Sequence, residues 1–447
     1  MTTKPTDHSR YHAKLYCAAA LGIGVSLAQV AGATFSDANW TPLGSGMSGI
    51  VLALATSGND LYAGGAFTNA GGKSANYIAK WNGSDWSALG SGMNTNVRAL
   101  AVMGSNLYAG GSFTTAGGSV ANYIAKWDGT NWTSLPLGMD CDVYALAVSG
   151  NDLYAGGCFT MAGATFANRI AKWNTTFWTA LGSGVSSSFV DALAGSGSDL
   201  YAGGNFKTAG GSPVNYVAKW DGGNWSALGS GMGGGVIPVV RALATSNGEL
   251  YAGGLFTWAT NNGVSVGVSN IAKWNGSTWT NLSSGLTGLL GVSAVVVWGN
   301  ELLAGGSFQN AGGNPAVGIA KWDGTNWMAL GSAVAGGSPP TVSSLAISGN
   351  DLYVGGTFTN AGGKACARIA RVYLGTLPTL SVARSAGSVT ISWPSAGTDG
   401  FALERADLLA PPTSWVSNTA SIGDDGTSKS VVIPATNSAQ FFRLRRP

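Results

Sequence analysis

The motif Tyr-Ala-Gly-Gly recurs at nearly constant spacing along this chain, and no other feature of the sequence constrains the fold so tightly. Two copies vary it, as Leu-Ala-Gly-Gly and Tyr-Val-Gly-Gly. The first residues of the copies are separated by 46, 46, 47, 50, 52 and 50 residues, and they are Tyr62, Tyr108, Tyr154, Tyr201, Tyr251, Leu303 and Tyr353. A repeat of about 50 residues with several short strands is typical of a propeller blade. The sequence therefore predicts seven blades.

Each repeat contains four strand-like segments. In the repeat from 97 to 136 these are 97–102, 107–113, 122–127 and a segment that begins at Trp132. They are rich in Val, Ile, Tyr and Trp, they are separated by Gly, Asn and Asp turns, and they show no helical periodicity. Six repeats place two tryptophans across the last turn, where aromatic side chains on neighbouring strands stabilise the pairing; the pairs are Trp81/Trp86, Trp127/Trp132, Trp173/Trp178, Trp220/Trp225, Trp274/Trp279 and Trp322/Trp327.

The seventh repeat lacks the second tryptophan and the fourth strand. A spare copy of that strand, Asn-Trp-Thr-Pro-Leu-Gly-Ser-Gly at 39–46, closely matches residues 224–231. We infer that Trp40 completes the seventh blade and closes the ring, which leaves no open sheet edge. The fold class is then all-β: a seven-bladed β-propeller over 34–375, closed by the N-terminal strand. Residues 376–447, where the repeat stops, predict a small β-sandwich.

Residues 1–33 have the pattern of a secretory signal peptide. Lys4, Arg10 and Lys14 precede an apolar stretch over 15–30, and Ala31-Gly32-Ala33 supplies a cleavage site with small residues. Cleavage is expected after Ala33, which predicts a secreted, extracellular or periplasmic protein. No later segment is apolar enough to span a membrane.

Composition excludes several kinds of chemistry. The only histidines, His8 and His12, lie in the signal peptide, so the mature chain cannot use imidazole for metal binding or for a catalytic triad. Asp140 and Asp142 fall short of the six to eight oxygens of a Ca²⁺ site. We expect no metal, no cofactor and a monomer. A net charge of +3 without a basic run argues against nucleic acid as a partner.

Three cysteines remain after cleavage, and two of them, Cys141 and Cys158, flank one predicted hairpin. A secreted protein can form a disulfide between such residues. The predicted strand register places them diagonally rather than opposite one another, which favours free buried thiols. The disulfide is the minor alternative.

The repeat resembles a known family. Tyr108-Ala-Gly-Gly-x-Phe113-x-x-Ala116-Gly-Gly, followed by Ile124-Ala-Lys-Trp-Asp-Gly-x-x-Trp132, is similar to kelch-type propellers of the galactose-oxidase-like superfamily. Secreted bacterial propellers and the propeller of fungal cortical polarity-marker proteins are especially similar. The resemblance covers residues 39–373 and implies the fold rather than an activity. Lys126-Trp127-Asp128 suggests WD repeats, but their Gly-His element is missing. Residues 379–447 resemble short fibronectin-type-III-like modules.

Functional residues are expected where the repeats differ. When the repeats are aligned on the tyrosine, one variable column interrupts the constant Val-x-Ala-Leu frame of the first strand; it contains Leu52, Arg98, Tyr144, Asp191, Arg241, Ser293 and Ser343. These side chains are predicted to surround the mouth of the central channel. The longest insertion, 257–270, adds Trp258.

Five of these residues are candidates for ligand binding: Arg98, Tyr144, Asp191, Arg241 and Trp258. Aromatic faces stack on ligands and guanidinium groups donate to oxygens, as a carbohydrate or an anionic ligand requires. The alternative is that the column is merely solvated and that Trp258 packs on its own loop.

The sequence therefore favours a non-catalytic binding or scaffold module for carbohydrates or cell-surface proteins. One alternative is a glycosidase or lyase that uses Asp191 with Asp140 or Asp142, which requires carboxylates about 5–10 Å apart. Another is a structural envelope component without a specific ligand.

Overall fold

The computed structural model describes residues 17–18, 35–186, 188–385, 387–396, 398, 401–407, 415–434 and 440–445. The chain forms two compact units, 34–374 and 375–447, the second of which also includes 1–33. The predicted signal peptide and its cleavage site lie outside the described residues, apart from Cys17 and Ala18.

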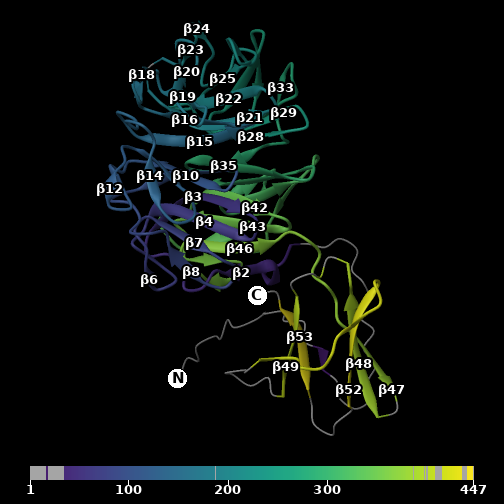
Figure 1. The fold of residues 1–447 in the computed structure, drawn as a ribbon. Helices are drawn as coiled ribbons and strands as arrows, with labels where there is room; N and C mark the ends of the chain where they lie inside the picture. The colour runs from purple at the N-terminus through teal and green to yellow at the C-terminus, as the bar shows by residue number, and fades with distance from the viewer. Residues whose placement is uncertain are drawn as a thin grey trace, which may run out of the picture. The chain divides into compact units, whose positions relative to one another are not determined.

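Seven antiparallel sheets of four strands make up the first unit (Figure 1). Each sheet is one blade, numbered here in chain order, with its strands given from the innermost to the outermost. Blade 1 contains β3 (Ile50–Ser57), β4 (Asp60–Ala66), β7 (Ile78–Trp81) and β8 (Trp86–Ala88). Blade 2 contains β9 (Val97–Met103), β10 (Asn106–Gly111), β13 (Ile124–Trp127) and β14 (Trp132–Ser134). Blade 3 contains β15 (Val143–Ser149), β16 (Asp152–Gly157), β19 (Ile170–Trp173) and β20 (Trp178–Ala180).

The remaining blades repeat this order. Blade 4 contains β21 (Val190–Ser196), β22 (Asp199–Gly204), β25 (Val217–Trp220) and β26 (Trp225–Ala227). Blade 5 contains β28 (Val239–Ser246), β29 (Glu249–Leu255), β32 (Ile271–Trp274) and β33 (Trp279–Thr280). Blade 6 contains β35 (Gly291–Trp298), β36 (Glu301–Ser307), β39 (Ile319–Trp322) and β40 (Trp327–Ala329). Blade 7 contains β42 (Val342–Ser348), β43 (Asp351–Gly356), β46 (Ile369–Tyr373) and β2 (Trp40–Pro42).

The innermost strands form a closed ring. Each contacts the innermost strand of the next blade, from β3 to β42, and β42 contacts β3. The unit is therefore a β-propeller.

Short hairpins occupy the connections between second and third strands. They are β5 (Asn69–Ala70) with β6 (Lys73–Ser74), β11 (Thr115–Ala116) with β12 (Ser119–Val120), β17 (Met161–Ala162) with β18 (Thr165–Phe166), β23 (Thr208–Ala209) with β24 (Ser212–Pro213), β30 (Trp258–Asn261) with β31 (Val264–Gly267), β37 (Asn310–Ala311) with β38 (Asn314–Pro315), and β44 (Asn360–Ala361) with β45 (Lys364–Ala365). Three of them gain a third strand, namely β27 (Met232–Gly233), β34 (Leu286–Thr287) and β41 (Val334–Ala335).

The Gly-Gly doublet is required by the packing of one blade on the next. A β-carbon on Gly110 would lie 2.5 Å from Cγ1 of Val143, the first residue of the neighbouring innermost strand. The same contact recurs between Gly64 and Val97 and around the whole ring. A side chain at this position would force the blades apart, because protein cores have no spare volume for an added methyl group. The doublet therefore sets the close spacing of the blades.

The outer tryptophans join the blades by hydrogen bonds. The Trp86 indole N–H donates to the backbone carbonyl of Leu43, at 3.0 Å, in the segment that follows the preceding blade. Trp132, Trp225, Trp279 and Trp327 make the equivalent bond to a leucine carbonyl. At the junction of blades 2 and 3, the Trp178 indole N–H has no acceptor among the described residues. That junction thus differs from the others.

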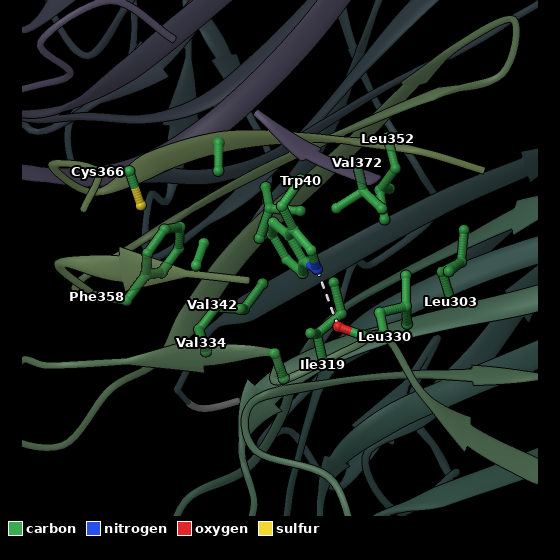
Figure 2. Close-up of a cluster of buried hydrophobic side chains, with 14 of the residues drawn as sticks. Trp40, Leu303, Ile319, Leu330, Val334, Val342, Leu352, Phe358, Cys366 and Val372 are labelled. Carbon is green, nitrogen blue, oxygen red and sulfur yellow. Dashed lines mark hydrogen bonds between the residues drawn. The ribbon is translucent and has the colours of Figure 1, made fainter. Parts of the chain in front are cut away.

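Strand β2 closes the ring at the seventh blade. It pairs antiparallel with β46, with Trp40 opposite Val372. Trp40 is 1% exposed, and its indole N–H donates to the carbonyl of Leu330 at 2.9 Å, as Figure 2 shows. The side-chain amide of Asn39, in the short 3₁₀ turn η1 (Asp37–Asn39), donates to the carbonyl of Tyr373 at 2.8 Å. The N-terminal strand thereby makes the contacts that an outer strand makes in the other blades.

The second unit contains two four-stranded sheets. One consists of β47 (Ser381–Ser385), β48 (Ser388–Pro394), β52 (Ser428–Pro434) and β51 (Gly423–Asp424). The other consists of β1 (Cys17–Ala18), β53 (Phe441–Arg445), β49 (Ala402–Ala406) and β50 (Val416–Ser417). Both contribute to one buried cluster, which includes Ile391, Trp393, Leu403 and Phe442. Among the described residues of the chain, no helix is long and apolar enough to cross a membrane.

The expectation of free thiols at Cys141 and Cys158 is wrong, because the two residues form a disulfide with their Cα atoms 5.6 Å apart. The regular register of β15 on β16 pairs Ala145 with Gly156, and an extra residue at Tyr144 then shifts the pairing so that Val143 faces Gly157. This one-residue shift brings Cys141 nearer to Cys158 than a regular ladder would. Cys366 is a free, buried thiol.

Candidate binding site at the channel mouth

The variable column predicted from the sequence coincides with a β-bulge in every innermost strand. The register shifts at Arg98, Tyr144, Asp191 and Arg241, so each is an extra residue without a partner on the neighbouring strand. Leu52, Ser293 and Ser343 occupy the same bulge in the other blades. A bulge redirects a side chain and is frequent near functional sites. We call this column, at the end of the ring where the innermost strands begin, the channel mouth.

Arg98 and Asp142 form the first part of the site. The Arg98 Nε donates to the Ser112 hydroxyl at 3.0 Å, and that hydroxyl donates to the Asp142 carboxylate at 2.6 Å. The Arg98 Nε itself lies 3.6 Å from the same carboxylate oxygen. Because Asp142 directly follows Cys141, the disulfide helps to fix the position of this carboxylate.

Tyr144 continues the site across two blade junctions. The Arg98 guanidinium lies 5.3 Å from the centre of the Tyr144 ring, within the range of a cation–π interaction. On its other side Tyr144 meets Phe189 edge to face, with ring centres 5.6 Å apart. An arginine and two aromatic rings therefore follow one another across blades 2, 3 and 4. Burial raises the pKa of Tyr144, so the phenol stays protonated at neutral pH.

Asp191 is a half-buried carboxyl group between the two arginines of the column. Burial raises its pKa to about 7, and the positive charges of Arg241 and Arg98 oppose that shift. A carboxyl group with this pKa changes its charge near neutrality. The mouth is therefore more positive below pH 7 than above it.

Arg241 connects the column to an apolar rim. Its Nη1 donates to the backbone carbonyl of Leu290 at 2.7 Å. Leu290 and its neighbour Leu289 are exposed, Leu289 by 75%. Val236 and Ile237, which precede β28, are also exposed, Val236 by 97%. These four side chains, the apolar rim, lie in the connections that lead into the innermost strands of blades 5 and 6.

Trp258 does not join the column. It begins β30, which pairs with β27, and its indole lies against Gly233 and Gly234 so closely that a β-carbon on either glycine would overlap it. Trp258 is 38% exposed. The structure thus brings Arg98, Tyr144, Asp191 and Arg241 together, whereas Trp258 packs on its own loop and its neighbour.

Three residues of the site lie outside the predicted candidates, namely Ser112, Phe189 and Leu290, and Asp142 is predicted only as a possible partner of Asp191 in the enzyme alternative. Asp142 and Phe189 occupy the position directly before the constant valine, and Ser112 occupies the position after Gly-Gly. Both positions vary from blade to blade. Variation between the repeats at these two alignment positions could therefore have identified Asp142, Phe189 and Ser112 as candidates.

Asp140 and Asp142 are both engaged in structural contacts. The Asp140 carboxylate accepts from the backbone N–H groups of Thr160 and Met161, at 2.8 and 3.0 Å, which caps the β17–β18 hairpin. Asn94 makes the same contacts in blade 2. Within the described part of the chain, no three His, Cys, Asp or Glu side chains gather as a metal site.

Solved structures that are similar to this chain include a WD40 propeller and a designed protein. The WD40 β-propeller domain of Doa1 matches 74% of this chain and 96% of its own, with 12% identity and a TM-score of 0.48. The computationally designed Ika4 protein matches 40% of this chain and 94% of its own, with 20% identity and a TM-score of 0.28. No family model and no curated protein matches the chain. The propeller assignment rests on the strand pairing and the ring of contacts.

The Asp191→Asn substitution should stabilise the protein at alkaline pH. Below about pH 4 the carboxyl group of Asp191 is protonated in the folded and in the unfolded chain, so it has little effect on stability there. Between about pH 4 and 7 the unfolded chain ionises first, so the carboxyl group destabilises the fold increasingly, and the loss of stability levels off above about pH 7. We expect the variant to gain about 1–3 kcal/mol in the free energy of unfolding at pH 8, after allowance for partial exposure. Urea unfolding at pH 4, 6 and 8 measures this; an equal effect at all three values would contradict it.

Proposed function

We propose that this chain is a secreted, monomeric, non-catalytic binding module, a kelch-type propeller with a C-terminal fibronectin-type-III-like module, and that its channel mouth binds a cell-surface protein. The observation that carries the proposal is the combination at the mouth of Arg98, Tyr144 and Arg241 with the exposed apolar rim. Arginine and tyrosine surrounded by apolar side chains are typical of the centre of protein interfaces. The predicted signal peptide and the disulfide support an extracellular location.

A binding role fits the carboxylates better than catalysis does. A glycosidase needs two carboxyl groups with separate roles. Asp191 is the only acid of the column, Asp142 is engaged by Arg98 and Ser112, and Asp140 caps a hairpin. These contacts leave Asp191 without a second carboxylate for acid–base work.

Carbohydrate is the second candidate ligand for the mouth. It is favoured by the stacking surface of Tyr144 and the guanidinium of Arg98 beside it. The apolar rim, which sugars do not require, makes protein the first choice.

The triple variant Arg98→Ala/Tyr144→Ala/Arg241→Ala tests the proposal. Biotinylated residues 34–447 should capture a defined protein from the surface of intact cells of the organism that produces the chain. The triple variant should capture at least about tenfold less of it. Lys219→Met, at the other end of the blades, should retain it. Circular dichroism and thermal melting verify that each variant is folded.

A glycan array run with the same proteins separates the candidates. A glycan signal that disappears in the triple variant would replace protein by carbohydrate as the ligand of the mouth. Capture that is unchanged in the triple variant would contradict the site, and no capture and no glycan signal would favour a structural envelope component.

A further inference from the structure

Five blades contain the same ion pair at the end opposite the channel mouth. The lysine near the end of the third strand binds an acid at the start of the second strand, at 2.6–3.2 Å. The pairs are Lys80–Asp60, Lys172–Asp152, Lys219–Asp199, Lys273–Glu249 and Lys321–Glu301. Each lysine is therefore neutralised within its own blade.

Blade 2 breaks this rule. Asn106 occupies the position of the acid, two residues before Tyr108, whereas Lys126 keeps the position of the lysine, opposite Tyr108. An amide cannot neutralise an ammonium group. The Lys126 ammonium has no hydrogen bond or ion pair to any of the residues that the structure describes. Its charge acts on the exposed carboxylate of Asp128, whose pKa is lowered mainly by backbone hydrogen bonds and less by Lys126. One positive charge thus remains available at this end.

A cleft of about 860 Å³ adjoins this charge between blades 2 and 3. Its polar lining includes Asn106, Lys126, Thr133, Asn151, Asn174 and Thr176. Asp152 also lines it, but its carboxylate is engaged by Lys172 at 3.2 Å. The cleft therefore combines one lysine without an ion-pair partner among the described residues with several amide and hydroxyl groups.

The walls of the cleft depart from the repeat at a second position. Leu135-Pro136 follows the outer strand of blade 2, where blades 1, 3 and 4 have Leu-Gly. Pro136 lines the cleft, at the junction where the Trp178 indole N–H lacks the leucine carbonyl used in other blades. The junction of blades 2 and 3 therefore differs from the repeat in two independent ways: Asn106 replaces the acid of the ion pair, and Pro136 replaces a glycine of the backbone.

We propose that this cleft is a second binding site, separate from the channel mouth, for a saccharide that carries a carboxylate. Lys126 binds the carboxylate as a compact charge with three donors. The side-chain amides and hydroxyls around it exchange hydrogen bonds with sugar hydroxyls, which are both donors and acceptors. A uronic acid unit matches both requirements.

The substitution Asn106→Asp is the sharpest test, because it recreates the ion pair of five other blades and is expected to preserve the fold. Trigalacturonic acid is the probe, titrated calorimetrically at low salt into residues 34–447. We expect binding to the parent protein and a loss of at least about tenfold in Asn106→Asp and in Lys126→Met. Lys219→Met, which removes a paired lysine in blade 4, and the mouth triple variant should bind as the parent does.

Three outcomes would overturn the proposal. The parent protein could fail to bind trigalacturonic acid, or Asn106→Asp could bind it unchanged. Equal binding of tetraglutamate would show that the cleft selects a carboxylate without the sugar. Binding of neutral galactotriose should be much weaker than binding of the acidic trimer, since the charge of Lys126 is then unused.

Discussion

Removal of residues 34–47 should unfold or aggregate the propeller out of proportion to the length of the deletion. The segment contains β2, whose loss would expose the edge of β46 to other chains. It also contains Trp40, which is buried and hydrogen-bonded to Leu330 (Figure 2). The Trp40→Ala substitution alone should lower the free energy of unfolding by about 3–5 kcal/mol, because it empties a large buried site and leaves a carbonyl without its donor.

Thermal melting and light scattering measure both effects. Trp258→Ala is a matched control, since that tryptophan is 38% exposed, and it should cost much less than Trp40→Ala. A truncated chain that melts at the temperature of the parent would show that β2 does not close the ring.

The disulfide should provide the second large contribution to stability. It joins residues separated by 17 positions, and a crosslink over a loop of this size stabilises by about 3 kcal/mol through the entropy of the unfolded chain. We expect the double variant Cys141→Ser/Cys158→Ser to lose about 2–4 kcal/mol in urea unfolding. The parent protein with reductant should behave like the variant.

The double variant contains its own control, because reductant should not affect it further. Cys366 remains in it as a buried thiol. If reductant leaves the unfolding curve of the parent unchanged, the disulfide contributes nothing to stability.

Loss of the disulfide should also weaken the contact of Asp142 with Arg98, because Asp142 directly follows Cys141. The affinity of the channel mouth for its ligand would then fall.

The propeller was predictable because every level of the sequence repeats. The spacing of the tyrosines gives the repeat, the turn residues give four strands, and the Gly-Gly doublet marks where Gly110 must admit Val143. The match of 39–46 to 224–231 was sufficient to place Trp40 beside β46, which the strand pairing shows. Each of these features is formed by residues that are close together in the chain, so a single sequence is sufficient to recognise it.

Contacts between strands were harder to predict, because small shifts in register change them. The bulge at Tyr144 brings Cys141 toward Cys158, and an alternating pattern does not reveal it. Lys80 lies 6.0 Å from the centre of the Tyr62 ring, on the strand that pairs with the strand of Tyr62. The ion pair of Lys80 with Asp60 joins residues 20 positions apart, and the spacing of the two residues does not reveal it.

The candidate site was predicted in part, because four of its residues occupy a position that repeats in every blade and Trp258 does not. Arg98, Tyr144, Asp191 and Arg241 share one alignment column, and equivalent positions of a ring lie at one height. Trp258 lies in an insertion that has no counterpart, so the repeat could not position it. Its packing on Gly233 and Gly234 depends on strand β27, whereas the described residues of blades 1 to 4 have only an isolated bridge at the equivalent place, such as Met47 with Ala70.

The most direct test of the account is site-specific photo-crosslinking on intact host cells. A photoreactive amino acid replaces Leu289 in the apolar rim, and in a second protein it replaces Met328, which is 39% exposed opposite Lys321 in the outer strand β40 of blade 6. We predict a discrete protein adduct from position 289, lost when Arg98→Ala, Tyr144→Ala and Arg241→Ala are added, and none from position 328. Equal adducts from both positions, or an adduct from position 328 alone, would contradict a binding site at the channel mouth.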